Sequence, residues 1–381
     1  MSWKGKTMEE LRTEFVLSAS NCLNFSALCK EYNITRKTGY KWFNRFKSNE
    51  SMSDKPKVPL TINNKTSPDI EQLILSERVN NPGYGARKLK IILENKYSIS
   101  FPCPATINNI LKRNNLISDA ESIKHKPYKR FEKNNCNDMW QTDFKGQFLT
   151  NDNKYCYILD IIDDHSRFLI DIAPFTSTEN VVLPTFERVF YKYGKPYSLL
   201  SDNGSQFAGF KKGYTKFEKW LMNHNVLPLH GRIKHPQTQG KIERFHRSLK
   251  NELLNYKTFN NIECVNIELQ KYKHKYNYER PHEALKMGYP ATIYHSSSRK
   301  YNPIVKEYQY SGIYLVLKVN SWGYIRFNDY KIYLSETMIN EHVELRPNEN
   351  NNSFIICYRN FIIAEIDAIT GNLLNRTIKR L

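Results

Sequence analysis

The chain has 381 residues, 40% of them hydrophobic, and its 57 Lys and Arg outnumber 38 Asp and Glu to give a formal net charge of +19. This surplus favours a polyanionic partner, either nucleic acid or an anionic membrane surface. No apolar run approaches the roughly 18–20 residues that span a bilayer, and no hydrophobic signal core follows the N-terminus, so we expect nucleic acid and no membrane.

Residues 1–50 are expected to form a helical DNA-binding domain. Apolar residues recur at spacings of three and four, which predicts short helices over 8–48. Thr35 should cap the last of them, over 36–46. There Tyr40, Phe43 and Phe46 (or Trp42) would pack, while four cations would project outward: Arg36, Lys37, Lys41 and Arg45. This pattern is typical of a helix-turn-helix whose last helix enters the major groove. A basic helical hairpin without a DNA role is the alternative.

The next segments alternate between linkers and helices. Residues 51–68 are polar and contain prolines, which indicates a linker. Residues 69–118 should form a second helical DNA-binding domain, with helices over 69–79, 85–97 and 105–114. Residues 119–136 form a basic linker with interleaved aromatic residues, suited to a phosphate backbone or to a solvated hinge.

The pattern then changes to an α/β alternation over 137–293. Apolar runs predict strands, and stretches of helical periodicity lie between the later ones. The expected strands are 139–144, 155–162, 167–173, 197–201 and 226–229, and the expected helices are 178–193, 216–224 and one from Gly240. This order indicates a mixed five-stranded sheet with helices on both faces. Residues 294–311 would be a linker. In 312–381 the short aromatic and β-branched runs 313–319, 324–327, 332–334, 354–358 and 361–366 predict a small β-barrel-like domain or curved sheet.

Three acidic residues of this core stand where chemistry is plausible. Asp143 lies near the end of an apolar strand, Asp202 ends another strand before Asn-Gly, and Glu243 lies in the first turns of a helix. Each alone would be an ordinary turn residue or a solvated helix residue. Together they could hold two hard cations for phosphodiester transfer, since Mg²⁺ prefers a few carboxylates plus water and phosphate oxygens.

The helix of Glu243 would also carry cations for DNA. Ile242, Phe245 and Leu249 form an apolar stripe, and Arg247 and Lys250 fall on the face of Glu243. Arg244 is a further candidate for a DNA contact. His246 is a secondary candidate for the site, although a packed or exposed His is the simpler interpretation. The competing acids are expected to be structural: Asp160, Asp163, Asp164 and Asp171.

The motifs around the three acids resemble a known family. The segments 140–143, 201–207 and 235–246 are similar to the three blocks of the integrase-type core of DDE transposases from bacterial insertion sequences, and 278–285 is similar to the segment that closes such cores. Forty residues separate Asp202 from Glu243, a few more than is usual in the family. We expect the surplus in a surface loop over 209–215, where added length costs little.

The resemblance implies an RNase H-like fold and two-metal catalysis by Asp143, Asp202 and Glu243 as both catalytic residues and metal ligands. The expected cofactor is Mg²⁺, which Mn²⁺ would replace. The implied reaction is cleavage at the transposon ends, followed by attack of the freed 3′-hydroxyl on target DNA. The implied partners are terminal inverted repeats, target DNA and further copies of the chain assembled on DNA.

Other functions stay open at this point. A catalytically silent or domesticated DNA-binding regulator of transposase origin would keep the helical domains without the chemistry. A recombinase with a covalent Tyr or Ser nucleophile would leave the acidic motifs unexplained. The seven scattered cysteines include no C-x-x-C pair, which predicts reduced thiols rather than disulfides or a zinc knuckle. We therefore expect a cytoplasmic, nucleoid-associated bacterial protein.

Overall fold

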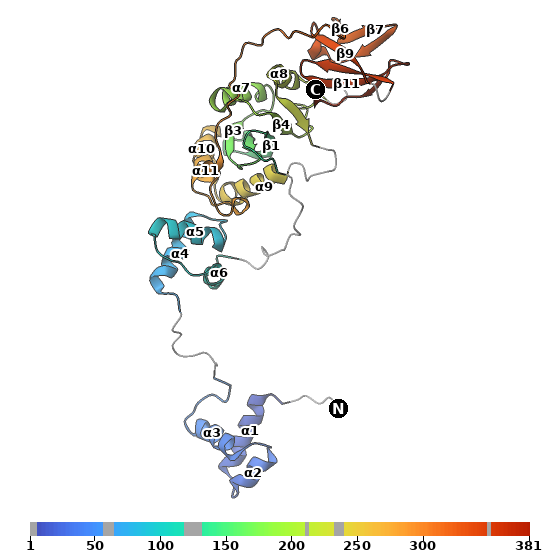
Figure 1. Ribbon diagram of the computed structural model, residues 1–381. Helices are drawn as coiled ribbons and strands as arrows, with labels where there is room; N and C mark the ends of the chain where they lie inside the picture. The colour runs from blue at the N-terminus through green and yellow to red at the C-terminus, as the bar shows by residue number, and fades with distance from the viewer. Residues whose placement is uncertain (1–5, 56–64, 118–131, 210–212, 232–239, 349–351) are drawn as a thin grey trace. The chain divides into compact units, whose positions relative to one another are not determined.

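The computed structural model describes residues 6–55, 65–117, 132–209, 213–231, 240–348 and 352–381 (Figure 1). Its contacts divide the chain into two compact units, Met1–Lys65 and Thr66–Leu381. None of the described helices is both long and apolar enough to cross a bilayer. Half of the linker expected over 51–68, namely 56–64, and most of the basic linker expected over 119–136, namely 119–131, lie outside the described residues.

The first unit consists of α1 (Met8–Ser20), α2 (Phe25–Glu31) and α3 (Arg36–Lys47). The Thr35 hydroxyl accepts a hydrogen bond from the Thr38 amide, so the predicted cap of α3 is confirmed. Gly39 allows α3 to approach its neighbours, because a Cβ there would lie 2.7 Å from the Cys29 sulfur. Trp42, one turn further along the same face, is consequently buried.

Two details of α3 differ from expectation. Tyr40 and Phe46 are exposed, because Trp42 takes the inward position, although the Tyr40 ring still stacks on Phe25 with the ring centroids 4.3 Å apart. Arg45 does not project outward: its guanidinium lies over the Trp42 ring, 4.8 Å from the centroid, and pairs with Glu50 at 3.8 Å. The Arg45 side chain therefore packs on the indole of Trp42. The charge of a residue alone does not predict such a packing role.

The second unit begins with α4 (Pro68–Asn80), α5 (Ala86–Tyr97) and α6 (Pro104–Arg113), close to the predicted bounds. Their core includes Ile74, Leu89 and Ile107, all without exposed surface. This bundle packs directly on the following core. Gly83, at φ +86°, lies so close to the Asn251 carbonyl that a Cβ would be 2.6 Å from its oxygen.

The central sheet has the order β3-β2-β1-β4-β5. Its strands are β1 (Met139–Leu149), β2 (Tyr155–Asp163), β3 (Leu169–Phe175), β4 (Ser198–Ser201) and β5 (Leu227–His230). β1 pairs antiparallel with β2 and parallel with β4, so the predicted mixed five-stranded sheet is confirmed. All five strands begin within two residues of their predicted positions, because each apolar run is bounded by turn residues.

Helices cover both faces of this sheet. On one face, α7 (Val182–Tyr193) and α8 (Lys216–Asn223) pack through residues such as Phe186 and Leu221 against Leu159 and Ile161 of β2. On the other face lie α9 (Gly240–Leu249), the π-helical turn η4 (Lys250–Leu254) and α10 (Ile262–Tyr278). The short elements η5 (Glu283–Leu285) and α11 (Pro290–Ile293) follow.

The C-terminal part contains a β-sheet of order β12-β11-β10-β9-β6, with β13 beside β11, and a separate hairpin β7-β8. Its elements are β6 (Leu315–Lys318), β7 (Tyr324–Phe327), β8 (Tyr330–Tyr333), η6 (Glu336–Met338), β9 (His342–Asn348), β10 (Ser353–Tyr358), β11 (Phe361–Asp367), β12 (Leu373–Asn375) and β13 (Lys379–Arg380). β6 and β12 end the order among the described strands, so the sheet is open, and of the two expected arrangements only the barrel-like domain is contradicted. β9 was not predicted, because its charged residues interrupt the apolar alternation.

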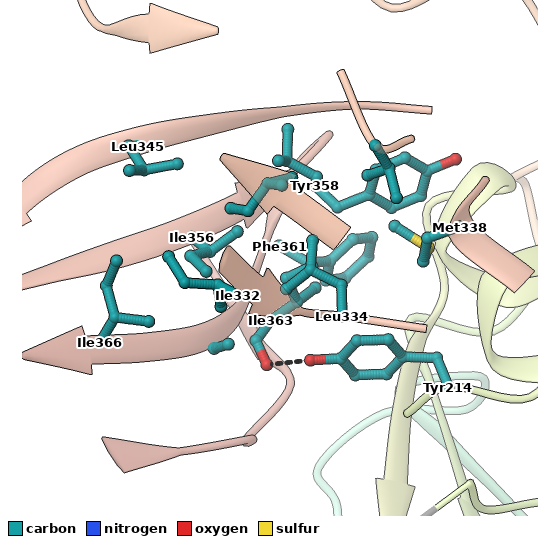
Figure 2. Close-up of a cluster of buried hydrophobic side chains, with 14 of the residues drawn as sticks. Tyr214, Ile332, Leu334, Met338, Leu345, Ile356, Tyr358, Phe361, Ile363 and Ile366 are labelled. Carbon is teal, nitrogen blue, oxygen red and sulfur yellow. Dashed lines mark hydrogen bonds between the residues drawn. The ribbon is translucent and has the colours of Figure 1, made fainter. Parts of the chain in front are cut away.

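A segment of the central core anchors this C-terminal sheet. Tyr214 inserts into the buried cluster of the sheet, and its hydroxyl donates a hydrogen bond to the Ile363 carbonyl (Figure 2). Gly213, at φ +100°, passes so close to Leu334 and Ser335 that a Cβ would be 2.6 Å from each. The expectation of a surface loop over 209–215 is therefore wrong for residues 213–215, whereas 210–212 lie outside the described residues.

Candidate active site

The site is built on three neighbouring strands that each present an Asp at the same level. Asp143 of β1 is paired directly with Asp160 of β2. The parallel register of β1 and β4 runs from Met139 opposite Ser198 to Gln141 opposite Leu200. The same offset continued by two residues sets Asp143 level with Asp202, directly after β4. Side chains at one level of adjacent strands point to the same face, so two predicted acids are brought together with a third that was ranked structural.

Burial and mutual repulsion change the acidity of this row. Removal from water, followed by the charges of Asp160 and Asp202, raises the pKa of Asp143 from 3.8 to about 7, although His246 partly opposes the change. No described Lys or Arg forms an ion pair with Asp143 or Asp202. The Asp202 carboxylate accepts one hydrogen bond from the Gly204 amide, 3.0 Å away. Two adjacent carboxylates without a Lys or Arg partner among the described residues fit a hard divalent ion.

Glu243 lies on α9, beside the sheet. The apolar stripe of α9 is buried as predicted, through Ile242, Phe245 and Leu249. Glu243 itself is exposed and has no hydrogen bond to a described residue. No group of three His, Cys, Asp or Glu at metal-ligand spacing occurs among the described residues. The structure therefore brings Asp143 and Asp202 together but leaves Glu243 outside their immediate cluster.

His246 makes contacts that the sequence did not indicate. Its Nε2 lies 2.7 Å from Asp160 Oδ2, and its Nδ1 lies 3.9 Å from Asp143 Oδ2. Burial lowers the pKa of His246, but the charge and hydrogen bond of Asp160, together with Asp143, outweigh this and raise the pKa above its usual value. A signal for this pair was present in the run Tyr157–Ile162, where Asp160 interrupts an otherwise apolar buried strand.

The other competing acids have structural partners. Asp163 accepts hydrogen bonds from the amides of Asn137 and Ser166, both at 2.8 Å. Asp164 is buried and binds the Lys241 ammonium group at the start of α9. Asp171 pairs with Arg188 and Lys273. Asp163 and Asp164 are thus buried hydrogen-bonding centres, more tightly packed than the ordinary turn residues expected.

The cations of α9 differ in availability. Arg247 and Lys250 are exposed and have no described partner. Lys250 is the first residue of the π-helical turn η4, so it does not continue the regular α-helical face of Glu243. Arg244 lies 3.6 Å from Glu283. In the first unit, Arg36, Lys37 and Lys41 are exposed as expected.

Replacing Asp143 by Asn should stabilise the metal-free protein at neutral and alkaline pH. The unfolded carboxyl ionises near 3.8 and the folded one near 7. The penalty of the charged carboxylate is therefore absent below pH 4 and grows as pH rises to 7. We expect a gain on the order of 2 kcal/mol at pH 8 that vanishes near pH 4. Urea unfolding with EDTA at both pH values measures it, and an equal effect at both would contradict the assigned cause.

Comparison with known proteins agrees with this architecture. Two family models, both described as "Integrase core domain", match residues 133–236 and 224–290. The chain is 26% identical over 160 residues to "Putative integrase ORF3" of Spiroplasma virus SpV1-C74, which covers 39% of this chain and 44% of that protein. It is 23% identical over 150 residues to an uncharacterized 31.7 kDa protein of insertion element IS407 of Burkholderia multivorans, covering 39% of this chain and 52% of that protein. The matches thus span about half of each relative.

Solved structures of retroviral proteins are also similar. The HTLV-2 integrase catalytic core domain in complex with magnesium has a TM-score of 0.32 and 18% identity, covering 42% of this chain and 99% of that one. A chain of the simian T-cell lymphotropic virus intasome in complex with PP2A regulatory subunit B56 gamma has a TM-score of 0.38 and 13% identity, covering 82% and 98%. Both scores are low, and the family assignment depends on the domain models and the sequence relatives. The five-stranded sheet with helices on both faces is the RNase H-like integrase core fold.

Proposed function

Because this chain belongs to the insertion-element type of the integrase and transposase family, we propose that it is a transposase that cleaves DNA at the ends of its element and joins the freed 3′-hydroxyls to target DNA. The observation that carries this proposal is that Asp143, in the middle of β1, lies level with Asp202, which directly follows β4, with the helix of Glu243 packed beside them. Three carboxylates from two strands and one helix are the donor set that such chemistry requires.

The chemistry assigns distinct tasks to these residues. Asp143 and Asp202 would hold Mg²⁺, or Mn²⁺ in its place, and Glu243 would complete the set. Bound cations of this kind activate the attacking oxygen and stabilise the leaving one. With its pKa raised to about 7, Asp143 is partly protonated at neutral pH, and binding of a cation would release that proton. Glu243, exposed on α9, would join the two Asp when DNA and cation are both bound.

Basic side chains would position the DNA. Arg247 and Lys250 extend from the region of Glu243 without ion-pair partners among the described residues, so they are free to contact phosphates near the reacting bond. Arg244 would have to exchange Glu283 for a phosphate. In the first unit, Arg36, Lys37 and Lys41 of α3 would read the terminal repeats, whereas Arg45 would support Trp42 from within. Joining two ends calls for several copies of the chain on the DNA.

The test is a reaction with a labelled duplex that carries the terminal sequence of the encoding element. With Mg²⁺ or Mn²⁺ we expect nicking at the 3′ end and joined products, and with EDTA neither product. A duplex with a scrambled end is the control for specificity. Specific binding without cleavage in either metal would favour the regulator, and a covalent protein–DNA adduct would favour a Tyr or Ser recombinase.

A further inference from the structure

A buried acid–imidazole pair lies beside Asp143 and has no role in the three-carboxylate scheme. Asp160 has no exposed surface and is paired across the strands with Asp143. His246 reaches it from α9 with a contact of 2.7 Å. The pair therefore links the sheet to the helix of Glu243 at the level of the reacting groups.

Stability does not explain the presence of Asp160. Its Oδ1 has no hydrogen-bond partner among the described residues, and His246 is the only described side chain that pairs with its carboxylate. The neighbouring inward positions of β2 are Ile158 and Ile162, packed in the same apolar cluster as Phe245. Replacement of both members of such a buried pair by well-packed hydrophobic residues is often neutral or stabilising. The cost of burying Asp160 is thus unexplained by packing.

The geometry of His246 indicates what the pair does. The imidazole stands between two carboxylates, with Nε2 toward Asp160 and Nδ1 toward Asp143. His246 follows Glu243 by three residues, one helical turn on the same side. On the other side of Glu243, Lys241 is bound to buried Asp164. Contacts to Asp160 in β2 and to Asp164 directly after β2 therefore fasten α9 on either side of Glu243.

We propose that Asp160 is a positioning residue which, through His246, orients the carboxylate of Asp143 and fixes the catalytic face of α9 beside it. This inference deepens the proposed function and depends on it for its effect on DNA chemistry. Asp160 binds Nε2 of the imidazole and thereby fixes the orientation of the ring. Nδ1 is consequently held in a fixed position facing the carboxylate of Asp143. Outer partners of this kind orient the groups that bind a metal.

The test combines Asp160→Asn, His246→Gln and the double variant. Each single variant should lower the rate of strand transfer about tenfold to a hundredfold and weaken Mn²⁺ binding in the same range, because loss of such partners has effects of that size. The double variant should be no slower than the slower single variant, since the two residues act as one unit. Binding of the terminal duplex should be unchanged. Mn²⁺ binding is measured by electron paramagnetic resonance, without DNA.

Asp171→Asn is the matched control. Asp171 is a buried acid on the adjacent strand β3, but its partners are Arg188 and Lys273 rather than His246. The Asp171→Asn variant should bind Mn²⁺ with wild-type affinity, even if the substitution lowers the melting temperature of the protein. If Asp160→Asn fails to fold, His246→Gln carries the test, because the imidazole sits at the border of the core with 13% of its side chain exposed.

Two results would overturn the proposal. One is wild-type Mn²⁺ affinity and strand transfer in the folded single variants. The other is a double variant whose loss equals the product of the two single losses. If the wild-type chain neither cuts nor joins DNA, the proposed function fails separately. The ¹⁵N chemical shifts of His246 then still test the pair, and shifts that are the same with and without Asp160 would contradict it.

Discussion

Glu243→Gln is expected to abolish both end cleavage and strand transfer, with a rate loss on the order of a thousandfold or more, as for removal of an essential member of a catalytic set. Gln keeps the size of the side chain but removes the negative charge that a divalent cation requires. Because Glu243 is exposed and makes no hydrogen bond to a described residue, folding and end binding should be unchanged. Both activities are measured on labelled terminal duplexes with Mg²⁺.

Glu263→Gln is the control for this experiment. Glu263 is likewise an exposed acid in the first turn of a helix, α10, but it lies away from the row of Asp143 and Asp202. It should retain wild-type rates. If Glu243→Gln transfers strands at the rate of the control variant, Glu243 is not a catalytic residue. If both variants lose the same fraction of the wild-type rate, the cause is a general effect of charge on DNA binding.

Tyr214→Ala is expected to destabilise the second unit by about 3–5 kcal/mol, because it leaves a large cavity in the C-terminal cluster. Tyr214 is buried there among Leu334, Met338 and Ile363, and its hydroxyl bonds to the Ile363 carbonyl (Figure 2). Tyr214→Phe keeps the ring and should cost only about 1 kcal/mol for the lost hydrogen bond. Urea unfolding of the full chain measures both.

The comparison of these two variants also tests how the C-terminal sheet is held. A separate, earlier transition in Tyr214→Ala would show that the anchor couples the sheet to the catalytic core. An equally small loss of unfolding free energy in Tyr214→Ala and Tyr214→Phe would contradict the anchoring role, because the aromatic ring would then contribute nothing beyond its hydroxyl group.

The segment that carries Tyr214 illustrates one limit of reasoning from sequence. Its extra length between Asp202 and Glu243 is visible in the sequence, and a surface loop is the cheapest way to accommodate extra residues. The contacts of Gly213 and Tyr214 with Ser335 and Ile363 join residues more than a hundred positions apart. No local pattern encodes such pairing, so only the folded chain shows that these residues form an anchor.

Local and periodic features of the sequence were sufficient for much of the fold. The strands of the central sheet are apolar runs bounded by turn residues, and α9 has a clear apolar stripe at Ile242, Phe245 and Leu249. The cap at Thr35 depends on residues only three positions apart. In the C-terminal part, β9 was missed because charged residues such as Glu344 interrupt its apolar pattern, and its place in the sheet depends on pairing with β6 and β10.

The sequence by itself identified Asp143, Asp202 and Glu243 as candidates, because each stands in a motif that resembles its counterpart in a known family. Only the tertiary structure decided which acids share a level of the sheet: Asp143 and Asp202 do, and Asp160 joins them across β2. It also decided the place of His246, whose two nitrogens face acids from different strands. Strand register and helix docking bring these groups together, and both arise from contacts between residues far apart in the chain.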